Sequence, residues 1–270
     1  MRQLWADNLG NLSTTYNVEA GKFGLFEIRY SGVAAAAVTV TLANLGNVRL
    51  NLNGSDIINL DVEALSLMAN NYGGYVEASS VAGGAFAFTI FIPAGYWFDP
   101  KNVFYFGKSD KAYYQLQFSA LTPAVIDSGN VTIYGNPGKG VQSYIHKILS
   151  KQAVSSAASG VITDSIQEKN IISLYLKDPT TLIDNLILIR DGETVVNGSM
   201  VSELVYSNWI HQLEAANVLY IGEFVPNKNL AQALSNAFSY QYNFTAAGNL
   251  EQYYSAIEFT PDRQTLSMAG

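Results

Sequence analysis

Residues 47–54 read Asn-Val-Arg-Leu-Asn-Leu-Asn-Gly, and residues 185–192 read Asn-Leu-Ile-Leu-Ile-Arg-Asp-Gly. Each has the composition of a β-strand and ends in Asn-Gly or Asp-Gly. These pairs are typical of two-residue hairpin turns because both positions tolerate a positive φ angle. The two stretches are separated by a constant offset of 138 residues (185 − 47 and 192 − 54). The sequence therefore predicts the same strand and the same hairpin turn twice.

The repetition extends outward from these hairpins. A short strand is predicted after each turn, at 56–60 and 194–197, and a helix then begins near Asp61 and near Ser199. Other strand-like segments also correspond in order: Phe26–Gly32 with Ser173–Asp178, Phe86–Pro93 with Val218–Pro226, Tyr113–Ser119 with Phe238–Thr245, and Val131–Tyr134 with Tyr254–Thr260. Each half thus offers about eight strands with one helix between its early and late strands.

A repeat of this size indicates a duplicated domain rather than a solenoid, whose periods are about 20–50 residues. Short antiparallel strands with long connections fit a jelly roll. We therefore expect an all-β fold of two consecutive eight-stranded antiparallel jelly-roll β-sandwiches, a double jelly roll, with short helices in loops. The alternative is chance similarity, because β-sandwich sequences share turns and alternation.

The expected domains are residues 1–150, a first jelly roll with an N-terminal arm, and residues 151–270, a linker with a second jelly roll. The crossover is placed at 150–170, which is rich in Ser, Ala and Gly. Alternation predicts a strand at Val38–Leu42. Helices are expected from Asp61 to about Asn70, from about Met200 to Leu213, and over the short segment Val141–Leu149.

Composition restricts the function further. Hydrophobic residues make up 49% of the chain but charged residues only 14%, against about 25% in ordinary soluble domains. A surface with so few charges suggests cover by neighbouring subunits. The net charge is −7, and no Lys/Arg cluster is visible along the sequence, so direct nucleic-acid binding is not expected. Without cysteine, disulfides and thiolate zinc sites are excluded. We also find no apolar run of about 20 residues and no signal-peptide pattern near Met1.

Catalytic motifs are weak. The two histidines are His146 and His211, and His211 lies beside Trp209 with Glu214 nearby. It could serve as a base or a metal ligand, but a structural role is the better interpretation because no second His or Cys has ligand spacing. The Gly-x-Ser-x-Gly elbow of serine hydrolases is absent. We expect no enzymatic activity and no cofactor.

Four carboxylates near strand ends of the second half, Asp178, Asp184, Asp191 and Glu193, are candidate ligands for a structural calcium ion. The competing interpretation is that they stabilise turns. The Gly73-Gly74 and Gly83-Gly84 pairs lack a phosphate-loop context and are expected at loop tips. Aromatic residues could form a sugar-stacking platform or pack at subunit contacts, and we favour packing: Tyr72, Tyr75, Tyr96, Trp97 and Phe98.

Two blocks resemble a known family. Residues Glu27–Val33 are similar to the first strand of the major capsid proteins of icosahedral phages with an internal membrane, the corticovirus type. Residues 174–177 and 189–192 resemble the start of that family's second jelly roll, where a strand also ends in an Asp-Gly turn. The piece between Ala34 and Asn47 and the C-terminal tail depart from the pattern.

The resemblance implies a structural virion protein whose trimers have a pseudo-hexagonal outline and tile an icosahedral shell, over an internal lipid membrane. It implies contacts with copies of itself, with that membrane and with vertex or minor capsid proteins, and assembly in the host cytoplasm. The N-terminal arm, with Leu4, Trp5, Leu9 and Leu12, would then face the membrane. The alternative is a carbohydrate- or receptor-binding double β-sandwich, such as a spike or lectin-like protein.

Overall fold

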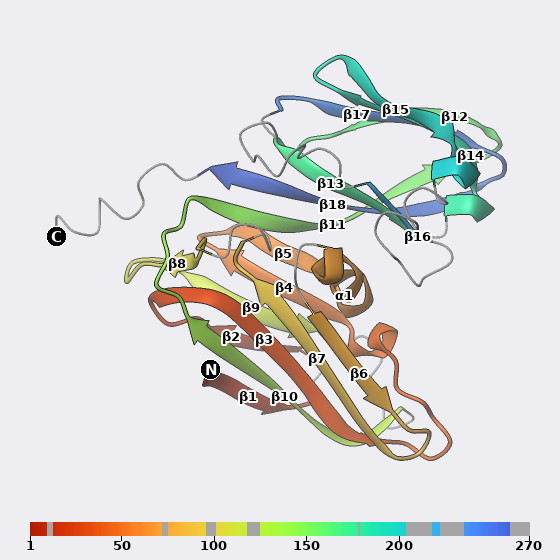
Figure 1. Ribbon diagram of the computed structural model, residues 1–270. Helices are drawn as coiled ribbons and strands as arrows, with labels where there is room; N and C mark the ends of the chain where they lie inside the picture. The colour runs from red at the N-terminus through yellow and green to blue at the C-terminus, as the bar shows by residue number, and fades with distance from the viewer. Residues whose placement is uncertain are drawn as a thin grey trace. The chain divides into compact units, whose positions relative to one another are not determined.

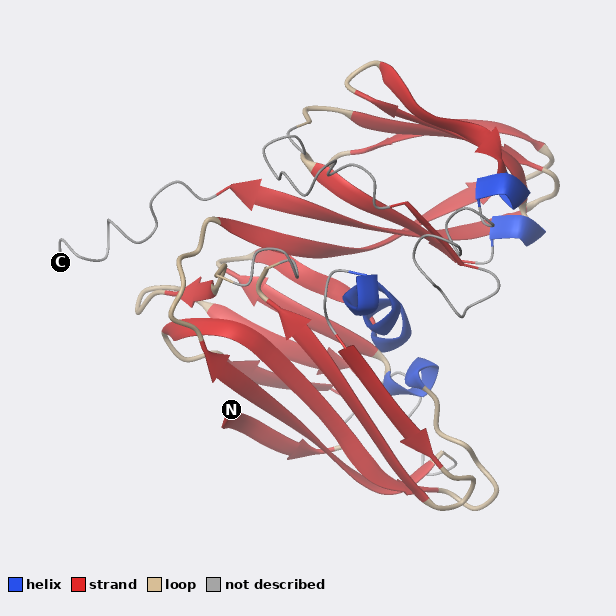
Figure 2. Cartoon of the chain, in the orientation of Figure 1, coloured by secondary structure: helices blue, strands red, loops and turns tan. Residues whose placement is uncertain are grey.

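The computed structural model describes residues 1–9, 13–71, 75–95, 101–117, 125–177, 179–203, 218–221 and 235–259. The described residues divide into two compact units: unit 1 comprises Met1–Lys147 and Phe259, and unit 2 comprises Ile148–Glu258. Both consist mainly of β-strands, as Figures 1 and 2 show. The two units are described separately.

Unit 1 contains two antiparallel sheets. One has the strand order β1-β10-β3-β7-β6, with β8 paired to the start of β3, and the other contains β5-β4-β9-β2 in that order. The strands are β1 (Arg2–Asn8), β2 (Ser13–Asn17), β3 (Gly21–Ala34), β4 (Asn47–Leu52), β5 (Ser55–Asp61), β6 (Tyr75–Ser80), β7 (Ala85–Pro93), β8 (Phe104–Phe106), β9 (Ala112–Gln117) and β10 (Ile126–Pro137).

Unit 2 also contains two sheets. One has the order β11-β18-β13-β16 and the other β12-β17-β14-β15. The strands are β11 (Tyr144–Ser156), β12 (Gly160–Ile166), β13 (Ile171–Lys177), β14 (Ile183–Arg190), β15 (Glu193–Ser199), β16 (Val218–Ile221), β17 (Phe238–Phe244) and β18 (Gly248–Phe259), and a short 3₁₀ helix, η2 (Pro179–Thr181), precedes β14.

The two units use their strands in the same order. In unit 2 the first, eighth, third and sixth strands form one sheet, and the second, seventh, fourth and fifth form the other. Unit 1 follows the same scheme when β6 and β8 are set aside as additions. This is the strand arrangement of a jelly roll, so the predicted double jelly roll is confirmed.

The repeated hairpins agree in detail. Strand β4 pairs with β5 from Asn47↔Asp61 to Leu52↔Ser55, and β14 pairs with β15 from Asn185↔Ser199 to Arg190↔Glu193. Both ladders shift register at the same point, after Leu50 in unit 1 and after Leu188 in unit 2. The offset of 138 residues therefore holds for every pair, including the β-bulge.

The sequence offset also reaches the helix that follows each hairpin. Helix α1 (Val62–Asn71) begins after Asp61, whose Oδ1 accepts a hydrogen bond from the Ala64 backbone N–H at 2.7 Å. In unit 2 the described helical residues are 200–203, and Ser199 Oγ accepts from Ser202 N–H at 3.3 Å. Both are N-caps at equivalent positions. The rest of the predicted Met200–Leu213 helix lies outside the described residues.

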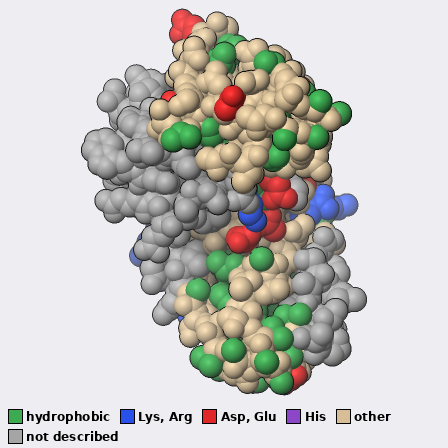
Figure 3. All heavy atoms as spheres, turned by 90° about the vertical axis from the view of Figure 1, so that its right-hand side faces the viewer, with side chains coloured by type: hydrophobic (Ala, Val, Ile, Leu, Met, Phe, Trp, Pro, Cys, Tyr) green, Lys and Arg blue, Asp and Glu red, His purple; other side chains and the backbone are tan. Residues whose placement is uncertain are grey.

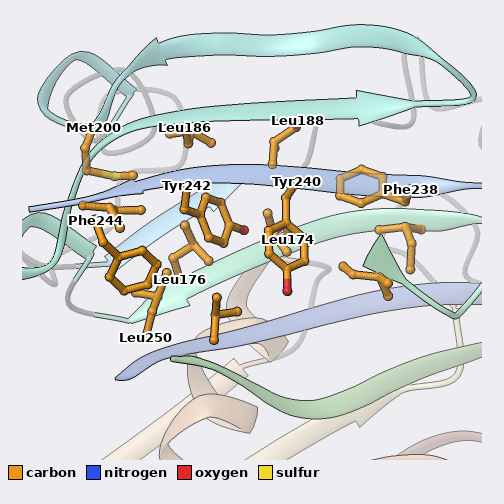
Figure 4. Close-up of a cluster of buried hydrophobic side chains, with 14 of the residues drawn as sticks. Leu174, Leu176, Leu186, Leu188, Met200, Phe238, Tyr240, Tyr242, Phe244 and Leu250 are labelled. Carbon is orange, nitrogen blue, oxygen red and sulfur yellow. The ribbon is translucent and has the colours of Figure 1, made fainter. Parts of the chain in front are cut away.

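Each core lies between the two sheets of its unit. In unit 1, the Phe26 ring of β3 meets the Tyr114 ring of β9 edge to face at 5.3 Å between centroids. In unit 2, Figure 4 shows side chains from facing strands meeting in one apolar cluster. There Tyr240 and Tyr242 stack at 4.5 Å, and the Tyr242 hydroxyl donates to Gln252 Oε1 at 2.5 Å, joining β17 to β18. Burying large aromatic rings supplies much of the folding free energy, roughly 1.5–3 kcal/mol for a side chain of this kind.

Three local predictions were wrong. Val38–Leu42 is not a strand: this stretch docks on the turn after β6 through a Gly83 N–H···O=C Val38 bond of 2.9 Å, and a 3₁₀ helix, η1 (Leu42–Leu45), follows. The segment Val141–Leu149 is not a helix, because most of it belongs to β11, where Tyr144 and Ile145 are buried. The stretch 150–170 is not an irregular linker, because it holds the rest of β11 and all of β12. Ser and Ala are accommodated in strands here because neighbouring strands supply the hydrogen bonds.

Candidate interaction surfaces

The turn of the first hairpin is fixed to the neighbouring strand by its own side chain. Asn53 and Gly54 have φ angles of 54° and 87°, as a turn with two positive φ values requires. The Asn53 backbone N–H donates to Lys111 O at 2.8 Å, and its Oδ1 accepts from Lys111 N–H at 2.8 Å. Its Nδ2 also donates to Asp110 Oδ1 at 2.7 Å. The turn is therefore tied to the start of β9.

The second hairpin has the same clamp with a different side chain. Asp191 and Gly192 have φ angles of 49° and 88°, and Asp191 N–H donates to Ala237 O at 3.0 Å. Asp191 Oδ1 accepts from the backbone N–H groups of Asn236 at 2.8 Å and Ala237 at 2.9 Å. These hydrogen bonds hold the pKa of Asp191 below its ordinary value. The Asp191 carboxylate thus accepts backbone hydrogen bonds from the segment before the neighbouring strand, as the Asn53 amide does in unit 1.

The calcium candidates that the structure describes do not meet in one place. Asp191 is engaged in the turn clamp, and Asp184 Oδ1 accepts from Asn243 Nδ2 at 2.7 Å near the other end of β14. Glu193 pairs with Arg190 in the backbone ladder across the turn from Asp191, and Asp178 lies outside the described residues. The part of the chain that the structure describes contains no group of three or more His, Asp or Glu side chains suited to a metal ion. Calcium binding stays a prediction.

The outward face of the first hairpin carries a polar network that its sequence did not reveal. Asp56 Oδ1 accepts from Arg49 Nε and from Asn51 Nδ2, both at 2.7 Å, while Asp56 Oδ2 accepts from Asn59 Nδ2 at 2.9 Å. Asn51 Oδ1 in turn accepts from Gly54 N–H at 2.9 Å. Asn51 is buried although it points away from the core. We call Arg49, Asn51, Asp56 and Asn59 the network face of unit 1.

The same positions of unit 2 are uncharged. At the offset of 138, Arg49 and Asn51 correspond to Ile187 and Ile189, while Asp56 and Asn59 correspond to Thr194 and Asn197. Beside them runs a shallow groove of about 300 Å³ across β12, β14 and β17, lined by Val161, Asn185, Ile187, Gln241 and Asn243. None of the five lining residues is charged, and Val161 is 55% exposed. We call these five residues the neutral face of unit 2.

The remaining candidates do not form a reaction centre among the described residues. His146 is buried in β11, and burial lowers its pKa to about 3, so it is neutral at physiological pH. His211, Trp209, Glu214, Tyr72, Gly73, Gly74 and Tyr96–Phe98 lie outside the described residues, as does the side-chain environment of Tyr75. Gly83 does lie in a turn, with φ 62°.

The N-terminal residues belong to the first sheet rather than to a separate arm. Leu4 and Trp5 are in β1, which pairs with β10, and Leu9 is buried. The Trp5 ring stacks on Tyr16 at 6.0 Å. Leu12 lies outside the described residues. Among the described helices, none has the length and apolar character needed to cross a membrane.

Comparison with solved structures identifies the fold. The major capsid protein of bacteriophage PM2 superposes with a TM-score of 0.58 at 10% identity, covering 96% of this chain and 99% of that one. The PBCV-1 protein VP54, fitted into a reconstruction of the virophage Sputnik, gives 0.58 at 10% identity, with 95% and 92% covered. A quasi-atomic model of the PBCV-1 virus capsid gives 0.56 at 7% identity, with 94% and 92% covered.

No protein-family model matches the chain, and no curated protein matches it in sequence. The structural agreement nevertheless spans both units and nearly the full length of the neighbours. The resemblance expected from residues 27–33 and 174–192 is thus confirmed as a shared architecture. This chain has the double jelly-roll fold found in the major capsid proteins of these viruses.

Proposed function

We propose that this protein is a structural virion protein, a major capsid protein without catalytic activity. The observation that carries the proposal is the duplication: two jelly rolls with the same strand order, hairpin register, bulge and helix cap lie in one chain. Proteins that share this complete two-unit fold with high coverage include the major capsid protein of bacteriophage PM2. A single binding module would need only one such unit.

The duplication also supports a trimer. Three chains with two similar units each present six similar blocks, so a threefold particle acquires a pseudo-hexagonal outline. Such blocks can fill a near-hexagonal lattice and close into an icosahedral shell. The low charge content of 14% fits a protein whose lateral surfaces are covered by other copies.

We assign the neutral face of unit 2 to contacts between copies. Its lining residues carry no charge, and Ile187 stands where unit 1 has Arg49. Interface cores are depleted in charged side chains, and a half-buried apolar side chain is covered at little cost. The network face of unit 1 has its polar groups paired within one subunit and is suited to water.

The remaining parts of the proposal rest on the resemblance to the major capsid proteins of internal-membrane phages. The shell would enclose an internal lipid membrane, contact vertex or minor capsid proteins and leave direct contact with nucleic acid to other components. The host would be a bacterium, with assembly in its cytoplasm and the final location in the virion.

The deciding experiment is mass measurement in solution followed by electron microscopy. Three copies of the 29.3-kDa chain give a particle of about 88 kDa. We expect this trimer and, at high concentration, hexagonal plates or closed shells. A stable monomer that binds glycans would contradict the proposal and favour a carbohydrate- or receptor-binding protein.

A further inference from the structure

Positive charges that are scattered along the sequence meet at one end of unit 1. Residues 1–147 contain nine Lys and Arg residues, and six of them occur in the segments that form this end: Arg2, Lys22, Lys101, Lys108, Lys111 and Lys139. We call these six residues the basic end. They come from five separate stretches of the chain, which is why no cluster is visible in the sequence.

Backbone contacts bring these stretches together. Lys22 lies where β3 begins and pairs with Tyr105 of β8, and Gly138 N–H donates to Lys22 O at 2.9 Å. Lys101 O accepts from Val141 N–H at 3.1 Å, which brings Lys101 to the segment that follows Lys139.

The other members join the same end. Arg2 pairs with Gly135 near the end of β10. Lys108 lies two residues after the end of β8, and the Lys111 backbone is held by the Asn53 clamp. Lys22 Nζ also donates to Gly140 O at 3.5 Å. The strand ends and loops of unit 1 therefore converge on one cationic surface.

Most of this charge faces solvent and outweighs the nearby acids. Arg2, Lys101, Lys108, Lys111 and Lys139 are exposed, and Lys22 is half-buried. The described acids in these segments are Glu19, which pairs with Arg2 at 2.8 Å, and Asp110, which bonds the Asn53 amide. Asp99 lies outside the described residues.

The other three cations of residues 1–147 are differently placed. Arg29 and Arg49 form ion pairs with Glu27 and Asp56, and Lys147 is buried. Among its described residues, unit 1 therefore carries its exposed, excess positive charge at the basic end.

The opposite end of unit 1 has a different character. There the stretch Ala34–Val40 and the turn with Val81 meet through the bonds Ala34 N–H···O=C Gly84 (2.8 Å) and Gly83 N–H···O=C Val38 (2.9 Å). Val81 is 61% exposed, and the charged residue next to this tip is Asp127. The lower part of Figure 3 shows hydrophobic side chains gathered on this side. Unit 1 is thus cationic at one end of its strands and mainly apolar at the other.

We propose that the basic end of unit 1 binds the surface of an anionic phospholipid bilayer. The inference rests on the proposed capsid role, and it specifies which end of the first jelly roll faces the internal membrane. Several lysines close to an anionic bilayer add their attractions, and the attraction decays within a Debye length. An exposed set on rigid strand ends can approach the headgroups together.

The residue types favour lipid headgroups over nucleic acid. Five of the six cations are lysines, and the one arginine is already paired with Glu19. Lysine acts as a mobile point charge and suits diffuse attraction to a phosphate-covered surface, whereas planar bidentate recognition of phosphate favours arginine. Tyr105 adds an aromatic ring beside Lys22 Nζ, at 5.9 Å from the ring centroid. Such rings are common at the headgroup level of membranes.

The test is sedimentation of the full-length protein with vesicles. Vesicles of phosphatidylcholine alone are compared with equimolar phosphatidylcholine and phosphatidylglycerol. The variant Lys108→Gln/Lys111→Gln/Lys139→Gln removes three charges from the basic end. The matched control, Lys169→Gln/Lys177→Gln/Arg190→Gln, removes three charges from unit 2. Trimer mass and thermal midpoint are measured for each protein.

We expect binding to the anionic vesicles only, lost in about 1 M salt. The basic-end variant should bind about 10- to 100-fold more weakly, while the control variant binds like the wild type. Equal losses in both variants, or no binding by a wild-type trimer, would overturn the inference and leave the capsid role standing. Tighter binding to duplex DNA than to vesicles, through the same lysines, would also overturn it. Vesicle binding by a stable monomer would instead contradict the capsid role alone.

Discussion

The two hairpins of the chain share a backbone and differ on their outward faces. Both have the same turn geometry, the same bulge position and the same clamp to the neighbouring strand. Yet the outward positions hold Arg49 and Asp56 in unit 1 but Ile187 and Thr194 in unit 2. Positions that determine how the backbone turns are alike in the two units, whereas three of the four outward positions, 49, 51 and 56, differ from their equivalents. The comparison separates residues that specify the jelly roll from residues that specify its neighbours.

The largest effect is expected on assembly when the neutral face is made charged. Ile187→Lys should leave each unit folded but weaken association of copies by about 100-fold, because an unpaired charge would be buried at the contact. Ala246→Lys, in the exposed turn after β17, is the matched control and should assemble normally. Analytical ultracentrifugation measures both variants. Normal assembly of Ile187→Lys would remove the neutral face from the subunit contact.

The next effect concerns the equivalent core leucines. Leu50→Ala and Leu188→Ala each remove a fully buried side chain from the fourth strand of a unit, which should cost about 2–5 kcal/mol of unfolding free energy. In calorimetry, each variant should shift the transition of its own unit. A single transition that moves equally in both variants would show that the units unfold together.

Disrupting the polar network should lower the unfolding free energy of unit 1, whereas the equivalent substitution in unit 2 should have little effect. Asp56→Ala leaves the buried Asn51 amide without the carboxylate that accepts its hydrogen bond, at a cost of about 1–3 kcal/mol. Thr194→Ala, at the equivalent exposed position, should change stability by less than about 0.5 kcal/mol. Urea denaturation compares the two. Equal costs would show that the network adds no stability.

Removing the helix N-cap should also destabilise unit 1 more than unit 2. Asp61→Ala should cost about 1 kcal/mol, because the carboxylate accepts from Ala64 N–H at 2.7 Å. Ser199→Ala should cost less, since its bond to Ser202 N–H is longer, at 3.3 Å. Thermal denaturation of both variants measures the difference, and a larger loss for Ser199→Ala would reverse this ranking.

The smallest effect is a pH dependence confined to the second turn clamp. The pKa of Asp191 is lowered in the folded protein by hydrogen bonds from Ala237 and Asn236. Its stabilising contribution is therefore present above the ordinary pKa, about 3.9, and is lost as the pH falls through the lower folded-state pKa. Neither Asn53 nor a backbone amide titrates in this range, so the two hydrogen bonds between Asn53 and the Lys111 backbone should be insensitive to this change.

Carboxyl chemical shifts measured by NMR during acid titration would report this pKa directly. Asp191→Asn should remove the acid sensitivity of the second clamp while keeping its turn. An Asp191 titration at or above the ordinary value would contradict the proposed role of the two backbone donors.

Local pattern was enough to find the repeat. The Asn-Gly and Asp-Gly turns need positive φ, the alternation of Val48 and Leu50 needs a core on one side, and Asp61 and Ser199 cap helices through neighbouring residues. These requirements act within a few residues, so they can be recognised from the sequence alone. They also placed most strands in the right order. Val38–Leu42 and Val141–Leu149 failed because contacts with distant segments, rather than local periodicity, determine their conformation.

The candidate surfaces depended on contacts that sequence distance hides. Asp56 bonds Arg49 and Asn51 because the hairpin places all three on one face. Asp191 accepts a hydrogen bond from Ala237, just before β17, because strand pairing brings the two residues together. Lys22, Lys101 and Lys139 are far apart along the chain, yet the jelly-roll connections return them all to one end of unit 1. Turn chemistry and alternation therefore determined that there are two similar sandwiches. Only the tertiary structure determined which charges gather and which faces stay neutral, because strand pairing joins residues that are distant in sequence.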